Sequence, residues 1–412
     1  MKTRIPMKLL AALTALCLLL SFGVFYAMAD EALDDLAVAQ DEASAEEDAL
    51  LAEFQALNTD VTRALNSGLA FDNNEFKILV LSDMDIGIGP YPAMLRAIDY
   101  MIEDTQPDLI VLNGDVTRKQ SSVFGITGSG VSIAWICDMI PKSIPFTVTF
   151  GENDALLPVS KNRYLARYQR YSNFLGYDDV PPDAGVGNHN LFVYADAAGA
   201  AGKDIADVAF NLWMLDTNKD GLFRTQSAWY GAKEYDAIFL ETDYIIPSMV
   251  FTHKSLLSTA NVAGGAEMLY MMEEFGNVKG AVSSHARSIS ETTSGGTTFF
   301  GTPGMAFTGK GERATRGGTL FTVTLIPVSE PAAGEAPYDV SIVPTPKPIW
   351  PYFDDDTAEG IGPKHAFYKA GVNWFFGPPA SFFGWMVGLF TNKYKVAYNI
   401  TQFWGDIFNF ML

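Results

Sequence analysis

The residues best suited to chemistry in this 412-residue sequence are carboxylates and imidazoles that follow short apolar runs. A single Asp in that position is usually a cap or turn residue, but five run ends of this kind favour a shared site. Carboxylate and imidazole donors bind divalent metals, and such metals can activate water for attack on phosphorus. The candidate ligands are Asp83 with Asp85, Asp115, Glu152, His253 and His285.

These side chains can meet only if the runs form strands whose carboxyl ends lie at one edge of a sheet, where open α/β sheets bind their ligands. Helical spacing between the runs predicts alternating strands and helices, and so an α/β body. The predicted strands are Phe76–Leu81, Leu109–Leu112, Pro145–Phe150, Leu191–Tyr194, Ala209–Leu215, Met249–Thr252, Ala281–Ser283, Thr297–Phe300 and Leu320–Ile326. Helices are predicted near Met94–Ile102, Ile133–Ile140, Tyr164–Phe174, Ala228–Phe239 and Ala266–Phe275.

Five segments with these polar ends resemble the motifs of one family. They are FDNNEFKILVLSDMDIG at Phe71–Gly87, PDLIVLNGD at Pro107–Asp115, FGEND at Phe150–Asp154, FTHKS at Phe251–Ser255 and AVSSHARS at Ala281–Ser288. In this order they are similar to the Asp-x-His, Gly-Asp, Gly-Asn-His-Asp, single-His and Gly-His-x-His motifs of calcineurin-like metallophosphoesterases, in particular the purple-acid-phosphatase-like branch. The resemblance spans Phe71 to Ile326. It implies a four-layer α/β/β/α sandwich and hydrolysis of phosphate esters by metal-activated water.

The resemblance implies a first metal site that lacks part of its ligand set. Its ligands would be Asp83, Asp85, Asp115 and Arg287, but a guanidinium repels a cation and cannot ligate one. Arg287 is instead expected to form an ion pair with Asp85, which relieves the repulsion between Asp85 and Asp83.

The second metal site implied by the resemblance keeps four residues that can coordinate: Asp115, Glu152, His253 and His285. Asn153 stands where the family has a histidine that assists the leaving group or the phosphate, and an amide cannot donate a proton as a general acid. The cofactor expected is one or two divalent ions of the Mn, Fe or Zn type.

Three interpretations remain open. The chain could be a hydrolase with one metal, in which Arg287 supplies the positive charge of the missing ion and stabilises charge in the transition state. It could be an inactive pseudo-phosphoesterase that binds a ligand or a partner. It could also be a structural envelope protein whose function lies in its C-terminal tail.

Composition restricts the partners. A formal net charge of −20 repels the phosphate backbone, which argues against nucleic-acid binding. The partners expected are a phosphate-ester small molecule or a phosphoprotein, with membrane contact through the N-terminus or the C-terminal tail as a further candidate. His189, in a loop rich in Gly and Pro, is expected to be exposed.

The ends of the chain differ from its middle. Residues 1–29 have the basic start, apolar stretch and small-residue end of an export signal or N-terminal anchor, which predicts an extracellular or cell-envelope location. Residues 30–70 are predicted to be an acidic helical spacer, residues 71–342 the phosphoesterase domain, residues 343–363 a Pro-rich and acidic linker, and residues 364–412 an aromatic-rich C-terminal segment.

Overall fold

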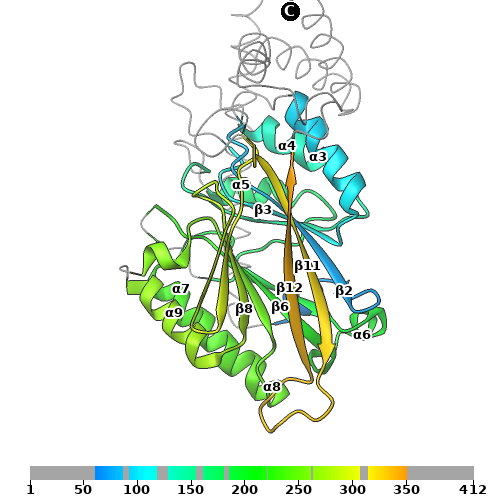
Figure 1. The fold of residues 1–412 in the computed structure, drawn as a ribbon, viewed down its shortest axis with the longest axis vertical. Coiled ribbons are helices and arrows are strands. Elements are labelled where there is room, and N and C mark those ends of the chain that lie inside the picture. The colour runs from blue at the N-terminus through cyan, green and yellow to red at the C-terminus, as the bar shows by residue number, and fades with distance from the viewer. Residues whose placement is uncertain are drawn as a thin grey trace, which may run out of the picture. The chain divides into compact units, whose positions relative to one another are not determined.

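Two β-sheets form the centre of the protein, and helices cover their outer faces (Figure 1). The computed structural model describes residues 61–86, 92–117, 129–154, 161–180, 185–219, 221–260, 263–306 and 314–349. The predictions for residues 1–29 and 364–412 lie outside these ranges, as does most of the predicted spacer. Among the described residues, no helix has both the length and the apolar character needed to cross a membrane.

The five-stranded sheet carries the first three predicted strands. Parallel pairing joins β2 to β3 and β3 to β4, whereas β11 runs antiparallel to both β2 and β12. In spatial order its strands are β12 (Tyr338–Pro348), β11 (Gly317–Pro327), β2 (Glu75–Leu81), β3 (Leu109–Asn113) and β4 (Phe146–Thr149).

The seven-stranded sheet carries the histidine strands. Its central strands β6, β7, β8 and β10 are parallel, so the loops after β7 and β8 leave the sheet at the same edge. In spatial order its strands are β1 (Leu69–Ala70), β5 (His189–Tyr194), β6 (Val208–Leu215), β7 (Ser248–Thr252), β8 (Val278–Ser283), β10 (Thr297–Gly301) and β9 (Ser290–Ser294).

The helices form two groups, one on each sheet. Figure 1 shows α7 and α9 side by side on the outer face of the sheet that contains β6 and β8, while α3, α4 and α5 belong to the other sheet. The α-helices are α2 (Thr62–Leu65), α3 (Pro92–Thr105), α4 (Ser129–Met139), α5 (Lys161–Tyr168), α6 (Ala197–Gly202), α7 (Arg224–Ala232), α8 (Leu240–Thr242) and α9 (Ala263–Phe275). A π-helix, Lys233–Phe239, continues α7, and 3₁₀ turns lie at Ile205–Asp207 and Leu256–Thr259.

Three apolar cores separate four layers. In β2, Ile78 and Val80 point into the core between the sheets, and Leu79 and Leu81 point into the core under α3, α4 and α5. Successive strand residues face opposite sides, and both sides are covered here, which explains why β2 is apolar from Ile78 to Leu81. The third core packs α7 and α9 against the seven-stranded sheet, with Trp213 at its centre. The predicted four-layer α/β/β/α sandwich is confirmed.

Two predicted boundaries differ from the structure. The Pro-rich segment that was expected to begin a linker at Val343 forms the second half of β12, which pairs with β11 along its length. The predicted spacer ends earlier than residue 70, because Ala64 of α2 is buried in a core and β1 pairs with β5.

His189 was predicted to be exposed, and this was wrong. It is fully buried, and its ring contacts the Thr147 hydroxyl at 2.8 Å and the carbonyl oxygen of Gly187 at 2.8 Å.

Candidate metal centre

Asp115, in the loop after β3, is held in place by the loop after β4. The backbone N–H of Asn153 donates to Oδ1 of Asp115 at 2.8 Å, and the side-chain amide of Asn153 donates to Oδ2 at 2.6 Å. The buried carboxylate of Asp154 accepts hydrogen bonds from the backbone N–H of Asp115 and of Gly151, each at 2.8 Å. Asn153, expected at a catalytic position, thus lies where it orients the Asp115 carboxylate.

His253, directly after β7, reaches Asp115 from the other sheet. Its Nδ1 lies 3.2 Å from the carbonyl oxygen of Asn113 and 3.1 Å from the hydroxyl of Ser284. In neutral His253, a proton on Nδ1 donated to that carbonyl would leave the Nε2 lone pair free for a cation beside Asp115, as in most histidines that bind metals. The close packing requires glycine at position 114, because a Cβ there would lie 2.5 Å from Nδ1 of His253.

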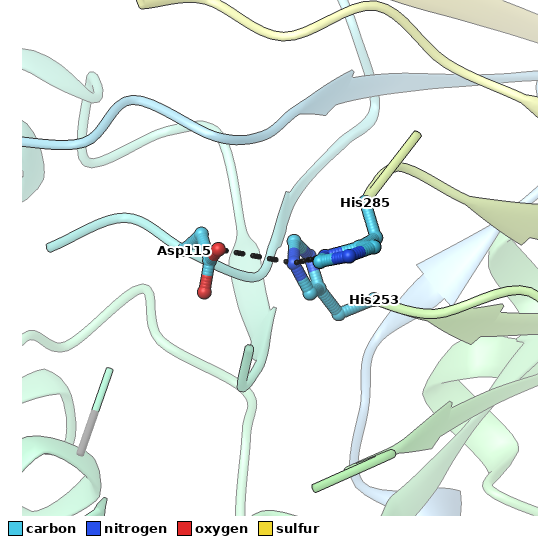
Figure 2. Close-up of side chains that lie close together, drawn as sticks. All are labelled: Asp115, His253 and His285. Atoms are coloured by element: carbon cyan, nitrogen blue, oxygen red, sulfur yellow. Dashed lines mark hydrogen bonds and ion pairs between the residues drawn. The ribbon is translucent and has the colours of Figure 1, made fainter. Parts of the chain in front are cut away.

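Three side chains, from both sheets, converge on one point (Figure 2). Nε2 of His253 lies 3.2 Å from Oδ2 of Asp115 and 3.3 Å from Nδ1 of His285. One ligand atom from each of these residues lies within 4.8 Å of the other two. Asp115 and His253 are buried and His285 is exposed, so the group is open to solvent on the side of His285. A carboxylate with two imidazoles is a donor set that holds one divalent ion and leaves coordination positions vacant for water or substrate.

Arg287 occupies the side of the site where the resemblance implied a first metal. Its Nε donates to Oδ1 of Asp83 at 2.9 Å, and its Nη1 lies 2.7 Å from Oδ2 of Asp85. The predicted ion pair between Arg287 and Asp85 is therefore confirmed, and Asp83 joins it. Gly304 leaves room for the arginine, because a Cβ there would lie 3.2 Å from Cγ of Arg287. A guanidinium in this position does not fit with a second cation bound by the same carboxylates.

Four residues of the site share the same unusual backbone conformation. Asp83, Asp85, Asp115 and Arg287 all have positive φ angles, of 48°, 49°, 50° and 53°. Non-glycine residues rarely adopt this conformation, and such residues cluster at functional sites, where the surrounding structure enforces them.

Glu152 does not join the other ligands. Its Oε2 lies 2.8 Å from Nζ of Lys254, and it is absent from the group formed by Asp115, His253 and His285. Partial burial acts to raise the pKa of Glu152, but the hydrogen bond and the positive charge of Lys254 outweigh it and lower the pKa. Of the second-site ligands that the resemblance implied, the structure brings three together and pairs the fourth with a lysine.

The charges of the site depend strongly on one another. Burial raises the pKa of Asp83 to about 6, against the opposing charges of His253 and Arg287. Burial also acts to raise the pKa of Asp115, but hydrogen bonds and charge from His253 and bonds from Asn153 lower it to about 2. Burial favours neutral His253, yet Asp115 outweighs it and raises the pKa of His253 to about 9. In the metal-free protein at neutral pH, Asp115 and His253 therefore form an ion pair.

Sequence reasoning gave no role to several residues that shape the centre. Asp154 fixes the Asp115 loop, Ser284 contacts His253, and Lys254 binds Glu152. The motif segments contain all three, but their types alone do not reveal these contacts.

Comparison with known proteins identifies the family of the chain. The family model for the calcineurin-like phosphoesterase matches residues 76–286, just over half of the chain. A search of curated proteins found no match. Among solved structures, a dimetal phosphatase from Danio rerio is 10% identical, with a TM-score of 0.44, and the match covers 65% of this chain and 98% of that one. GAP50, the anchor in the inner membrane complex of Plasmodium, is 11% identical with a TM-score of 0.44, covering 70% of this chain and 98% of that one. On the match of the family model, this chain belongs to the calcineurin-like phosphoesterase family.

Proposed function

We propose that the protein is a metal-dependent phosphoesterase that works with one divalent ion, held by Asp115, His253 and His285. The observation that carries this proposal is the convergence of one ligand atom from each residue to within 4.8 Å of the other two. A divalent ion bound there supplies Lewis-acid polarisation of a phosphoryl oxygen and activates water.

The residues around the three ligands support the proposal. Asn153 orients both oxygens of Asp115, and the carbonyl of Asn113 can accept the proton on Nδ1 of His253. Each oxygen of Asp115 has more than one lone pair, so accepting from Asn153 leaves capacity for a cation.

Arg287 takes the place of the second cation in this proposal. Its contacts with Asp83 and Asp85 use Nε and Nη1, so that, as far as the described residues go, the donors of Nη2 are available to a phosphoryl oxygen. Arginine suits planar, two-point recognition of phosphate and can stabilise negative charge that develops in the transition state. We expect the substrate to be a phosphate-ester small molecule or a phosphoprotein.

A second candidate is a pseudo-phosphoesterase that binds a ligand without hydrolysing it. One observation favours it: Arg287 and Lys254, two cations that the described ranges place beside the centre, are already neutralised, Arg287 by two aspartates and Lys254 by Glu152. Paired cations attract a phosphate less strongly than unpaired ones.

Metal analysis and turnover separate the two candidates. We expect about one Mn, Fe or Zn ion per chain after purification, and hydrolysis of p-nitrophenyl phosphate or bis-p-nitrophenyl phosphate that is lost with His285→Ala. The control is Asp339→Asn, which changes a partly exposed carboxylate on β12 that is paired with Lys279. Bound metal without turnover of either ester would support the binding protein, and absence of bound metal would remove the proposed enzyme.

We also propose that the protein is exported, with its N-terminal segment as signal or anchor. Fractionation of cells that express the full chain tests this. Recovery in the cytoplasm alone would contradict it.

A further inference from the structure

Glu152 lies near Asp115 and His285, but its carboxylate is not among the three converging ligand atoms. It lies between Gly151, whose backbone N–H donates to Asp154, and Asn153, whose backbone N–H donates to Asp115. Nevertheless its carboxylate contacts Nζ of Lys254 at 2.8 Å and stays outside the group of three ligand atoms.

Lys254 is held both at its backbone and at the end of its side chain. It follows His253 directly, and its backbone N–H donates to Oγ1 of Thr217 at 3.0 Å. Its Nζ donates to the carbonyl oxygen of Lys219 as well as to Glu152, and its side chain is only 14% exposed. Exposed ion pairs contribute little to stability and break easily. The ammonium group of Lys254 differs from these, because it has two partners and little exposure to solvent.

We infer that Lys254 holds Glu152 out of the coordination sphere, so that the centre stays a three-ligand site of one carboxylate and two imidazoles that prefers zinc to harder cations. The inference rests on the proposed function. Lys254 is thus a positioning residue that sets the number and type of ligands.

The metal preference follows from the chemistry of the donors. Zinc accepts nitrogen ligands and is stable with three protein ligands and one vacant position in catalytic sites. Magnesium and manganese favour carboxylate and carbonyl oxygens, so the loss of one carboxylate weakens their binding more. A free Glu152 would provide a second carboxylate on the loop that already carries Asn153.

Calorimetric titration of the purified full chain with Zn²⁺ and with Mn²⁺ tests the inference, because dissociation constants do not depend on turnover. We expect Glu152→Gln to change zinc affinity by less than about threefold, because Glu152 is not a ligand. We expect Lys254→Met to tighten manganese binding about tenfold or more, because Glu152 is released and a nearby positive charge is removed.

The double variant Lys254→Met/Glu152→Gln tests whether the gain depends on Glu152. It removes both members of the ion pair, so the local net charge matches that of the unaltered protein and Glu152 has no carboxylate to donate, and most of the gain for manganese should disappear. Lys254→Arg, which keeps the pairing cation, should behave like the unaltered protein and is the control, and Lys254→Gln replaces Lys254→Met if the latter does not fold.

Two results would overturn the inference. Weakening of zinc by about tenfold in Glu152→Gln, while the unaltered chain binds zinc, would make Glu152 a ligand and leave the proposed function intact. Absence of binding of either metal to the unaltered chain, together with absence of ester hydrolysis, would overturn the inference and the proposed enzyme alike.

Discussion

Replacing Arg287 by methionine removes the only cation that the structure places against both Asp83 and Asp85 among the described residues. Asp83 has no exposed side-chain surface, and its Oδ2 has no hydrogen-bond partner within the part of the chain that the structure describes. In the variant, this carboxylate must stay charged without a partner or take up a proton. Either outcome costs folding free energy, because a buried charge that has lost its partner is poorly solvated.

The expected loss can be estimated from the burial of the three side chains. Breaking a buried ion pair from one side costs about 3 to 5 kcal/mol, and the 12% exposure of Arg287 and 17% of Asp85 put this site at the lower end, about 3 kcal/mol at pH 8. The loss should shrink as the pH falls. Burial already raises the folded-state pKa of Asp83 from 3.8 to about 6, so a proton favours the folded state, and at pH 5 most of the cost is relieved.

Urea unfolding followed by tryptophan fluorescence measures the loss of unfolding free energy at pH 8 and at pH 5. The matched control is Arg224→Met, which breaks an ion pair of Arg224 with Glu267 whose side chains are 73% and 44% exposed, and which should change stability by less than about 1 kcal/mol. The combination of Arg287→Met with Asp83→Asn should recover part of the stability at pH 8. A loss of unfolding free energy in Arg287→Met that is equal at the two pH values, or no larger than the loss in Arg224→Met, would refute the reasoning.

Three further changes have clear expected results. The double change Asp85→His and Arg287→His restores the ligands that the resemblance implied, so metal analysis should find the content rising from about one to about two ions per chain. Gly114→Ala places a Cβ 2.5 Å from Nδ1 of His253 at a φ of +81°, so zinc affinity measured by calorimetry should fall by about tenfold or more. Burial raises the pKa of Glu234 to about 7, against hydrogen bonds that lower it, so stability should fall as the pH rises through 7. Glu234→Gln should then raise the unfolding free energy at pH 8 by about 2 kcal/mol and leave it nearly unchanged at pH 5.

Each of these changes has a control or a contrary outcome. Gly334→Ala imposes the same backbone strain at φ +83° with nothing within 4 Å, so it should leave zinc affinity unchanged. Metal content that stays at one in the double histidine variant would count against the alignment of Arg287 with a family histidine. A Glu234→Gln variant that is equally destabilised at pH 5 and pH 8 would mean that the side chain is needed as an ionised acceptor.

The sequence predicts the central strands because burial leaves a strong signal in them. The run Phe76–Leu81 is apolar apart from the partly exposed Lys77, because both faces are covered from Ile78 to Leu81, and it ends where the chain emerges at the site. Strands without that signal escape prediction. Every residue of β9, Ser290–Ser294, is polar and exposed, and the prolines of β12 read as a linker although the strand pairs with β11.

The candidate site was predictable as a set of residues and less so as a set of contacts. The resemblance places Arg287 at one site with Asp83 and Asp85, and opposite charge then predicts the pairing of Arg287 with Asp85. The pairing of Lys254 with Glu152 depends on two loops, from different sheets, lying side by side. No local pattern carries that information. His189 also reads as a loop residue, and only the tertiary structure shows that it begins a buried strand.

The two sheets meet at the candidate centre, and this has a consequence for how the domain comes apart. Asp115 belongs to the five-stranded sheet, and His253 and His285 to the seven-stranded sheet. A metal ion bound by all three residues would need both sheets in place. Its binding free energy would therefore add to the stability of the packing between the two sheets. Chelation would then lower the melting temperature by loosening the junction between the sheets, while the helices and strands within each half keep their own hydrogen bonds.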